Sequence, residues 1–198
     1  MRRGRAERQE QRAETRRGPG AGTESVQSPQ VNDGLGTRFQ MRQRMVSIGD
    51  DFWIENEHGR KVFKIDGKAI RVRGTLIFED ARGQELLKIQ ARIARVRDTM
   101  NIEDSGGSTA AVVHNALITP LRDRWQVDLP GRGEDMIVQG NVLNHEYHID
   151  VGRRQVAEVS KKWFRLRDSY GVQVTPGQNV PLLLAITVVI DMMAHEGR

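Results

Sequence analysis

The stretch Phe52–Gly59 (FWIENEHG) decides the fold, because the chain repeats its pattern twice at a spacing of 24 residues. The second copy is residues 76–83 (LIFEDARG), and the third is residues 100–107 (MNIEDSGG). An apolar run follows each copy in register, at residues 62–65, 86–89 and 110–113. Each unit thus consists of an apolar strand, a polar turn that ends in glycine, and a second strand. This order of residues is typical of a β-hairpin.

Three less regular hairpins follow. They cover residues 125–138, 147–159 and 163–174. In the last of them, Trp163–Leu166 is the predicted first strand and Asp168–Gly171 the predicted turn. Six hairpins correspond to about twelve strands, and Phe39–Val46 is a further candidate strand. Hairpins at this spacing favour an antiparallel sandwich or barrel over a parallel sheet.

The apolar segment after these hairpins differs from them, because no turn interrupts it. It follows Pro181 and reads LLLAITVVI over residues 182–190. Its β-branched residues favour a strand, but a length of about 14 residues is more typical of a helix. Asn179 and Pro181 suit the start of a helix, so we expect one over about 181–195.

This helix is apolar on every side, as helices buried in a protein core are. A barrel of about twelve strands leaves a lumen, and protein interiors pack densely, so the helix would fill that lumen. The expected fold class is therefore mainly β: an antiparallel closed barrel of about twelve strands around a central hydrophobic C-terminal helix. The residues expected to form this structural plug are Leu183, Ile186, Val189 and Ile190.

Residues 1–38 have a composition unlike that of the rest of the chain. Arg, Glu, Gln, Gly, Pro and Ser dominate them, and the stretch GPGAG at residues 18–22 disfavours regular structure. We therefore expect a disordered tail at 1–38 and a single barrel domain at 39–198. Two alternatives stay open: the tail's arginines attract a polyanion weakly, or translation starts at Met41 or Met45.

Charge and cysteine content limit the classes of function. The chain carries 31 basic and 26 acidic residues, of which residues 1–38 hold 8 and 5, so the predicted domain is close to neutral. It has no cysteine, which excludes disulfides and thiolate zinc sites. No run approaches the roughly 20 apolar residues of a membrane-spanning helix, and no secretory signal is visible. We expect a cytoplasmic protein, either soluble or peripheral at a membrane.

Motifs of catalysis and metal binding are few. The chain has neither a Gly-x-Ser-x-Gly elbow nor a phosphate loop. His145 and His148 are three residues apart, whereas zinc-protease helices place the second histidine four residues on. On a strand the two histidines would point to opposite faces, so we interpret them as surface residues rather than metal ligands. We expect no metal, no cofactor and no enzymatic activity.

Paired acids recur along the chain and raise a second catalytic hypothesis. They are Asp50-Asp51, Glu79-Asp80, Glu103-Asp104 and Glu134-Asp135. A glycosidase also uses two carboxylates. Three of these pairs precede a glycine-bearing turn, however, so turn formation explains them without catalysis.

Basic triplets are the more informative feature. Two Arg-Val-Arg triplets lie 24 residues apart, and an Arg-Leu-Arg triplet follows two lysines. On strands, both arginines of a triplet would share the outward face, where guanidinium groups bind phosphate bidentately. The candidate ligand-binding residues are Arg71, Arg73, Arg95, Arg97, Lys161, Lys162, Arg165 and Arg167. The alternative is an ordinary solvated face, neutralised by acids such as Asp98 and Asp168.

These features together resemble the LURP-one-related family, which shares its architecture with phospholipid scramblases and the tubby C-terminal domain. The resembling stretch runs from residues 39–44 (FQMRQR) to Ala194-His195. Its specific points are the opening MRQR, the Glu-Asp-x-x-Gly turns, residues 158–164 (EVSKKWF), residues 168–172 (DSYGV) and the terminal apolar helix. The resemblance implies a twelve-stranded barrel around a central hydrophobic helix.

The resemblance also implies where to look for function. Tubby domains bind phosphoinositide headgroups through basic residues on the barrel wall, so the first hypothesis is a non-enzymatic module that binds anionic lipid headgroups at a membrane surface. A second hypothesis is a nucleic-acid-associated protein that uses the tail and the basic ridges, although Trp125 and Trp163 are expected in strand cores. Lipid scrambling is a third, and it would require the helix to leave the barrel. Scramblases act with calcium, and the acidic calcium segment expected of them has no match in this chain.

Overall fold

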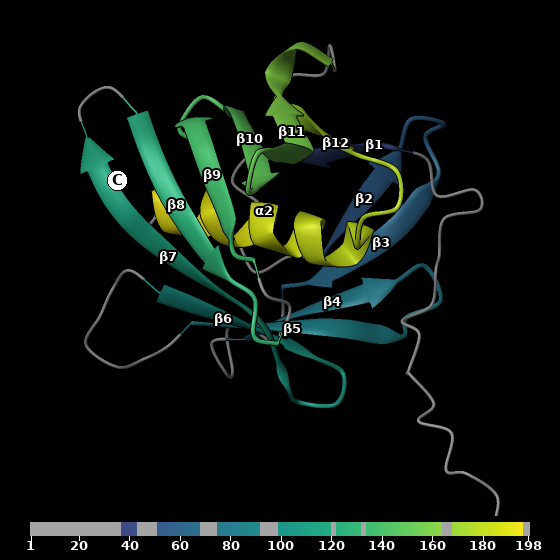
Figure 1. The fold of residues 1–198 in the computed structure, drawn as a ribbon. Helices are drawn as coiled ribbons and strands as arrows, with labels where there is room; N and C mark the ends of the chain where they lie inside the picture. Colours follow the sequence, from purple (N-terminus) through teal and green to yellow (C-terminus); the bar gives the residue numbers. More distant parts are fainter. Residues whose placement is uncertain are drawn as a thin grey trace, which may run out of the picture. The chain divides into compact units, whose positions relative to one another are not determined.

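A computed structural model of the chain shows that its described part forms a closed antiparallel barrel of twelve strands around one helix (Figure 1). The structure describes residues 37–42, 51–67, 75–91, 99–119, 122–131, 134–163 and 168–195. All of them belong to one compact unit, Val31–Arg198. The expected fold class is confirmed. The predicted tail at 1–38 lies almost entirely outside the described residues and stays a prediction.

The strands follow one another around the barrel in chain order, and the last pairs with the first. They are β1 (Arg38–Arg42), β2 (Phe52–Asn56), β3 (Lys61–Asp66), β4 (Thr75–Asp80), β5 (Glu85–Ala91), β6 (Thr99–Asp104), β7 (Thr109–Thr119), β8 (Arg122–Asp128), β9 (Met136–Asn141), β10 (Glu146–Val151), β11 (Arg154–Ser160) and β12 (Ser169–Val174). A short 3-10 turn, η2 (Lys161–Trp163), follows β11, and helix α2 (Val180–His195) follows β12.

The three sequence repeats fold into three equivalent hairpins, β2–β3, β4–β5 and β6–β7. In each turn one side-chain oxygen, from Asn56, Asp80 or Asp104, accepts hydrogen bonds from the backbone N–H groups two and four residues on. The glycine that closes each turn has a positive φ, for example 81° at Gly83, which a residue without Cβ adopts at little cost. Turn formation therefore accounts for Asp80 and Asp104, in two of the three acid pairs for which it was predicted.

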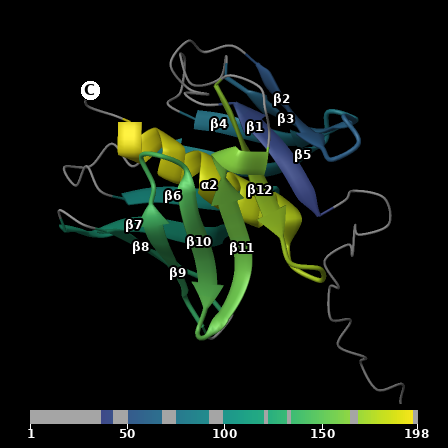
Figure 2. The same cartoon turned by 90° about the horizontal axis from the view of Figure 1, so that it is seen from above.

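Helix α2 passes through the barrel, with strands around it (Figure 2). Asn179 caps its start as predicted, because the Asn179 Oδ1 accepts a hydrogen bond of 3.2 Å from the Leu182 N–H. At about 1.5 Å per residue, its 16 residues span about 24 Å. The four expected plug residues are all buried: Leu183, Ile186, Val189 and Ile190. Inward-facing strand residues pack with the helix into one hydrophobic core.

The sixth predicted hairpin is wrong. Trp163, expected in a strand, lies in η2, and Ser169–Gly171, expected in a turn, belong to β12. Strand β12 pairs with β11 on one side and with β1 on the other, and these two ladders override the turn preference of Ser and Gly. Twelve strands are still reached because the further candidate strand near Phe39 forms β1. Residues 164–166 of the predicted strand lie outside the described residues.

Candidate functional site

Chain connectivity places the strand ends that flank the predicted basic segments at one end of the barrel. In an antiparallel barrel every second connection joins strand ends at the same end. The strand ends that flank the three basic segments therefore lie at one end: Asp66 and Thr75, Ala91 and Thr99, Ser160 and Ser169. Helix α2 finishes at this end too, because its Asp191 contacts His145 of the β9–β10 turn. We call it the basic end.

The connections at the two ends differ in charge. Those at the basic end are residues 43–51, 67–74, 92–98, 120–121, 142–145 and 161–168, with 11 basic and 4 acidic residues. Those at the opposite end are residues 57–60, 81–84, 105–108, 129–135, 152–153 and 175–179, with 4 basic and 3 acidic residues. Sequence and topology together thus assign most of the excess positive charge of the connections to one end of a nearly neutral domain.

Most of the predicted ligand-binding residues lie outside the described residues. They are Arg71, Arg73, Arg95, Arg97, Arg165 and Arg167. The other two, Lys161 and Lys162, lie in η2 immediately after β11. The Lys162 side chain is 81% exposed, and its Nζ is 3.5 Å from the carboxylate of Glu146.

Glu146, the first residue of β10, is the centre of a polar cluster beside these lysines. The Ser160 hydroxyl donates to its carboxylate, with both oxygens 3.0 Å away, and the Lys161 backbone N–H donates to Oε1 at 3.2 Å. Ser160 is buried, whereas the Glu146 side chain is 34% exposed. The carboxylate therefore contacts a buried hydroxyl on one side and solvent on the other. The sequence did not indicate this cluster, because Glu146 meets its partners only through the pairing of β10 with β11.

Trp163 adds an aromatic ring to the surface near these lysines. The Cζ of Arg38 lies 5.0 Å from the centre of the Trp163 ring, a cation–π contact. Trp163 is partly exposed, so the expectation that it lies in a strand core is wrong. Trp125 is buried in β8, as expected.

A second cluster of ionisable residues lies inside the barrel at the basic end. Asp191 of α2 is buried, and its Oδ1 is 2.6 Å from Nε2 of His145. One turn on, the Nδ1 of His195 is 2.8 Å from the Asp191 backbone oxygen and 3.4 Å from Oδ1. The His145 ring stacks on Tyr170, with ring centres 4.2 Å apart. These contacts hold the C-terminal part of α2 against the β9–β10 turn.

Two tyrosines complete the surroundings of Asp191. Burial raises the pKa of the Tyr147 and Tyr170 phenols above the usual value, and the negative charge of Asp191 raises both pKa values further. Thr187 lies near the Tyr147 hydroxyl, but its own hydroxyl donates to a backbone oxygen of α2. Within the described part of the chain, neither phenol oxygen makes a hydrogen bond of ordinary geometry, nor does Nδ1 of His145. The interior at this end is therefore more polar than the rest of the core.

The interpretation of His145 and His148 as two surface residues is wrong for His145. It is 2% exposed and lies in a turn with a φ of 53°, a region that histidine enters more readily than most residues. His148, on β10, is partly exposed and lies 3.2 Å from Asp150. A signal was present in the sequence, since a carboxylate in a buried apolar helix needs a partner. The sequence does not show which residue supplies it.

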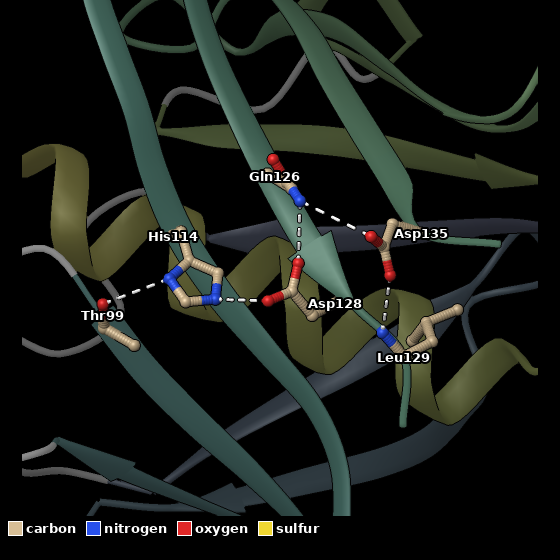
Figure 3. A network of polar contacts seen from close by, with 6 residues as sticks. All are labelled: Thr99, His114, Gln126, Asp128, Leu129 and Asp135. Carbon is tan, nitrogen blue, oxygen red and sulfur yellow. Dashed lines mark hydrogen bonds and ion pairs between the residues drawn. The ribbon is translucent and has the colours of Figure 1, made fainter. Parts of the chain in front are cut away.

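A third polar cluster lies on the outer face of β6, β7 and β8 (Figure 3). The Nε2 of His114 is 2.8 Å from Asp128, and its Nδ1 is 3.3 Å from the Thr99 hydroxyl. Gln126 donates to Asp128, and Asp135 accepts from a backbone N–H. The contacts follow the order hydroxyl, imidazole, carboxylate of hydrolase triads. The His114 and Asp128 side chains are 37% and 42% exposed, however, so water competes for each contact and we interpret the cluster as a solvated network.

Other surfaces offer less chemistry. Among the described residues, no group of three or more His, Asp or Glu side chains could hold a metal ion. No helix in the described part of the chain is long and apolar enough to cross a membrane. A groove is lined by Thr37, Gln155, Glu158, Gln173, Val174, Thr175 and Pro176. Among these described residues the one charged group is the carboxylate of Glu158, so the groove does not suit an anionic ligand.

The fold and the site place this chain in one class of protein. Its members are closed antiparallel barrels that an apolar helix fills, and the connections at one end of this barrel are rich in basic residues. The profile of the LURP-one-related family matches residues 37–191, so the chain belongs to this family, as the sequence features had indicated.

Two similar proteins accompany this match. "Uncharacterized protein YxjI" of Bacillus subtilis (strain 168) is 24% identical over 156 residues, which cover 79% of this chain and 93% of the relative. A protein from Arabidopsis thaliana with an X-ray structure is 18% identical, with a TM-score of 0.38, and the match covers 63% of this chain and 88% of that chain.

Proposed function

We propose that this LURP-one-related barrel is a non-enzymatic binding module for anionic phospholipid headgroups at a membrane surface. The observation that carries the proposal is the topology of the basic end. The strand ends that flank residues 67–74, 92–98 and 161–168 lie at one end of the barrel, so three separate basic segments are attached there. Lys161 and Lys162 are the described members of this set.

The excess of basic residues in the connections at one end of the barrel supports binding of that end to an anionic membrane surface. A membrane attracts a basic residue near anionic lipid by about 1 kcal/mol, and the attraction falls off within a Debye length of roughly 8–10 Å. Basic residues gathered at one end reach the lipid surface together, whereas the same charges spread over a neutral domain would not. Arginine and lysine side chains there would bind phosphate oxygens directly.

Two alternatives make different demands on the molecule. Binding to nucleic acid is favoured by one specific observation: Trp163 is partly exposed beside Lys161 and Lys162, and an aromatic ring next to basic groups is a feature of single-strand binding. Lipid scrambling would require α2 to leave the barrel. Of its 16 residues 12 are buried, and Asp191 is bonded to His145, so withdrawal of the helix would be costly.

A charge reversal at the basic end tests the proposal. Arg71→Glu with Arg95→Glu should abolish sedimentation with vesicles of phosphatidylcholine and phosphatidylserine, because two attractive charges become repulsive. The matched control is Arg82→Glu with Arg153→Glu, which makes the same change of charge at exposed turns of the opposite end. This control should sediment like the parent chain. Added salt should weaken the vesicle binding of the parent chain and of the control.

The outcomes separate the hypotheses. Loss of vesicle binding in the basic-end variant alone, with melting temperature unchanged, supports the proposal. Equal loss in both double variants would show that only net charge matters. If the parent chain shifts single-stranded DNA but sediments with no vesicle, the nucleic-acid alternative replaces the lipid one.

A further inference from the structure

Glu146 is held in the way that a bound anion is held. The Ser160 hydroxyl and the Lys161 backbone N–H donate to its carboxylate, and the Lys162 ammonium lies 3.5 Å away. These are three different kinds of donor from one short stretch of chain. Charged acceptors form the stronger hydrogen bonds with such donors, and phosphate oxygens accept them as carboxylate oxygens do.

The cluster has a fixed inner part and an open outer part. Ser160 is 3% exposed, and its Oγ accepts a hydrogen bond of 3.2 Å from the Lys162 backbone N–H. That bond leaves the hydroxyl proton free to point at Glu146. The Glu146 side chain is 34% exposed and the Lys162 side chain 81% exposed, so a solute can reach both. The Ser160 hydroxyl is thus held by the chain around it, whereas the exposed Lys162 side chain can turn.

The backbone beside Glu146 is fixed independently of its side chain. The preceding residue, His145, points into the barrel and bonds to Asp191 of α2. Glu146 itself pairs with Asn141 of β9 and Ser160 of β11 in the sheet. Its carboxylate can therefore leave the donors by rotation of the side chain alone, without loss of the plug or of a strand.

We propose that Glu146 is a built-in competitor that occupies a phosphate site formed by Ser160, Lys161 and Lys162. A phosphomonoester group displaces the carboxylate and takes the same three donors, with the ammonium of Lys162 turning from Glu146 to the phosphate. This inference rests on the proposed function, since the site belongs to connection 161–168 at the basic end. Glu146 thus sets the concentration of phosphate compound, or the density of phosphorylated lipid in a membrane, at which the phosphate site becomes occupied.

Removal of the competitor is the direct test. Glu146→Ala should lower the Kd for inorganic phosphate by about tenfold, the factor expected if the parent site is free about one-tenth of the time. The amide resonance of Lys161 in a proton–nitrogen NMR spectrum should report the binding, because that N–H donates to the ligand. The matched control is Glu158→Ala, which removes an exposed carboxylate from the neighbouring strand β11. It makes the same change in net charge and should leave the Kd unchanged.

Further variants keep the test decisive. Glu146→Gln retains the volume of the side chain and takes the place of Glu146→Ala if that variant folds poorly. Its Kd should lie between those of Glu146→Ala and the parent chain. Ser160→Ala in the Glu146→Gln background should return the Kd to the parent value or above it. Equal affinities in Glu146→Ala, Glu158→Ala and the parent chain would overturn the inference.

Vesicles separate this inference from the proposed function. Vesicles of phosphatidylcholine with phosphatidylinositol 4-phosphate should bind Glu146→Ala more tightly than Glu158→Ala. If the parent chain binds them but the two variants bind equally, the lipid role holds and the competitor role of Glu146 fails. If phosphate shifts the Lys161 amide in Glu146→Ala but no variant binds any vesicle, the site holds, free phosphate compounds are its ligands, and the lipid role fails.

Discussion

Two histidine–aspartate pairs of this molecule have nearly the same geometry and opposite surroundings. The ring nitrogen and carboxylate oxygen are 2.6 Å apart in His145–Asp191 and 2.8 Å apart in His114–Asp128. The side chains of the first pair are 2% and 3% exposed, and those of the second are 37% and 42% exposed. The comparison therefore isolates what burial adds to one kind of polar contact.

Water explains why the two pairs should differ. On the outer face, water solvates both groups whenever the contact opens, so pairs of this kind contribute about 0–1 kcal/mol. Inside the barrel no solvent replaces a lost partner, and a buried polar or charged group left alone costs several kcal/mol. Formation of the buried pair therefore adds little to the net free energy of unfolding. Loss of either partner is costly, however, so the position of α2 depends on the pair.

Loss of the buried carboxylate should have the largest effect. Asp191→Ala should lower the free energy of unfolding by about 3 kcal/mol, because it leaves both ring nitrogens of His145 without a partner inside the barrel. Urea denaturation measures the change. Asp191→Asn, which keeps an acceptor for the imidazole, should lose less. A change below 1 kcal/mol in Asp191→Ala would erase the contrast between the two pairs.

Alkaline pH should have the next largest effect, through the tyrosines around Asp191. The folded-state pKa values of Tyr147 and Tyr170 are raised above 10, first by burial and then by the charge of Asp191. Above pH 10 the unfolded chain therefore releases phenolic protons that the folded chain keeps. The free energy of unfolding therefore keeps the full contribution of the tyrosines below pH 10. Above pH 10 it falls by up to about 1.4 kcal/mol per pH unit for each tyrosine.

Urea midpoints at pH 9, 10 and 11 measure this slope. Lys64, whose pKa is raised by its hydrogen bond to Asp51, also loses stabilisation in the alkaline range as pH rises through its folded-state pKa. The variants Tyr147→Phe and Tyr170→Phe separate the contributions, because each should flatten the slope and leave the Lys64 effect in place. An equally steep slope in the double Phe variant would contradict the assignment to the tyrosines.

Loss of the exposed pair should have the smallest effect. His114→Gln should change the free energy of unfolding by less than about 1 kcal/mol, since both groups are solvated when apart. The same urea titration measures it, beside Asp128→Asn as the variant of the partner. A loss above 2 kcal/mol would show that the network of Figure 3 acts as a unit and that exposure alone does not predict its contribution.

The sequence predicted best those parts of the fold that local chemistry determines. Asn56, Asp80 and Asp104 bond to backbone N–H groups only two and four residues away, so the repeat in the sequence is already a repeat of turns. The helix was also predictable, because its length and its apolar residues on all sides leave few other structures. Its cap at Asn179 is again a local contact.

Features that depend on distant partners were the ones missed. Local sequence mispredicts Trp163 and Ser169–Gly171 because β12 pairs with β1, which lies more than a hundred residues earlier in the chain. Local sequence does not predict the burial of His145, because its partner, Asp191, comes 46 residues later on another element. No local pattern marks Glu146, since its contacts with Ser160 and Lys161 exist only once β10 and β11 are paired.

The order of elements along the chain has a consequence for synthesis and folding. The hairpins between β2 and β11 pair neighbouring segments, and isolated hairpins form within about 1–10 μs. Closure of the barrel is slower than hairpin formation, because it brings together Arg38 and Gln173, which are 135 residues apart in the chain. Helix α2, which forms one hydrophobic core with the inward-facing strand residues, leaves the ribosome after all twelve strands. The nascent chain therefore exposes a nearly complete apolar sheet until α2 is available, and during that interval it is most dependent on chaperones and most prone to aggregate.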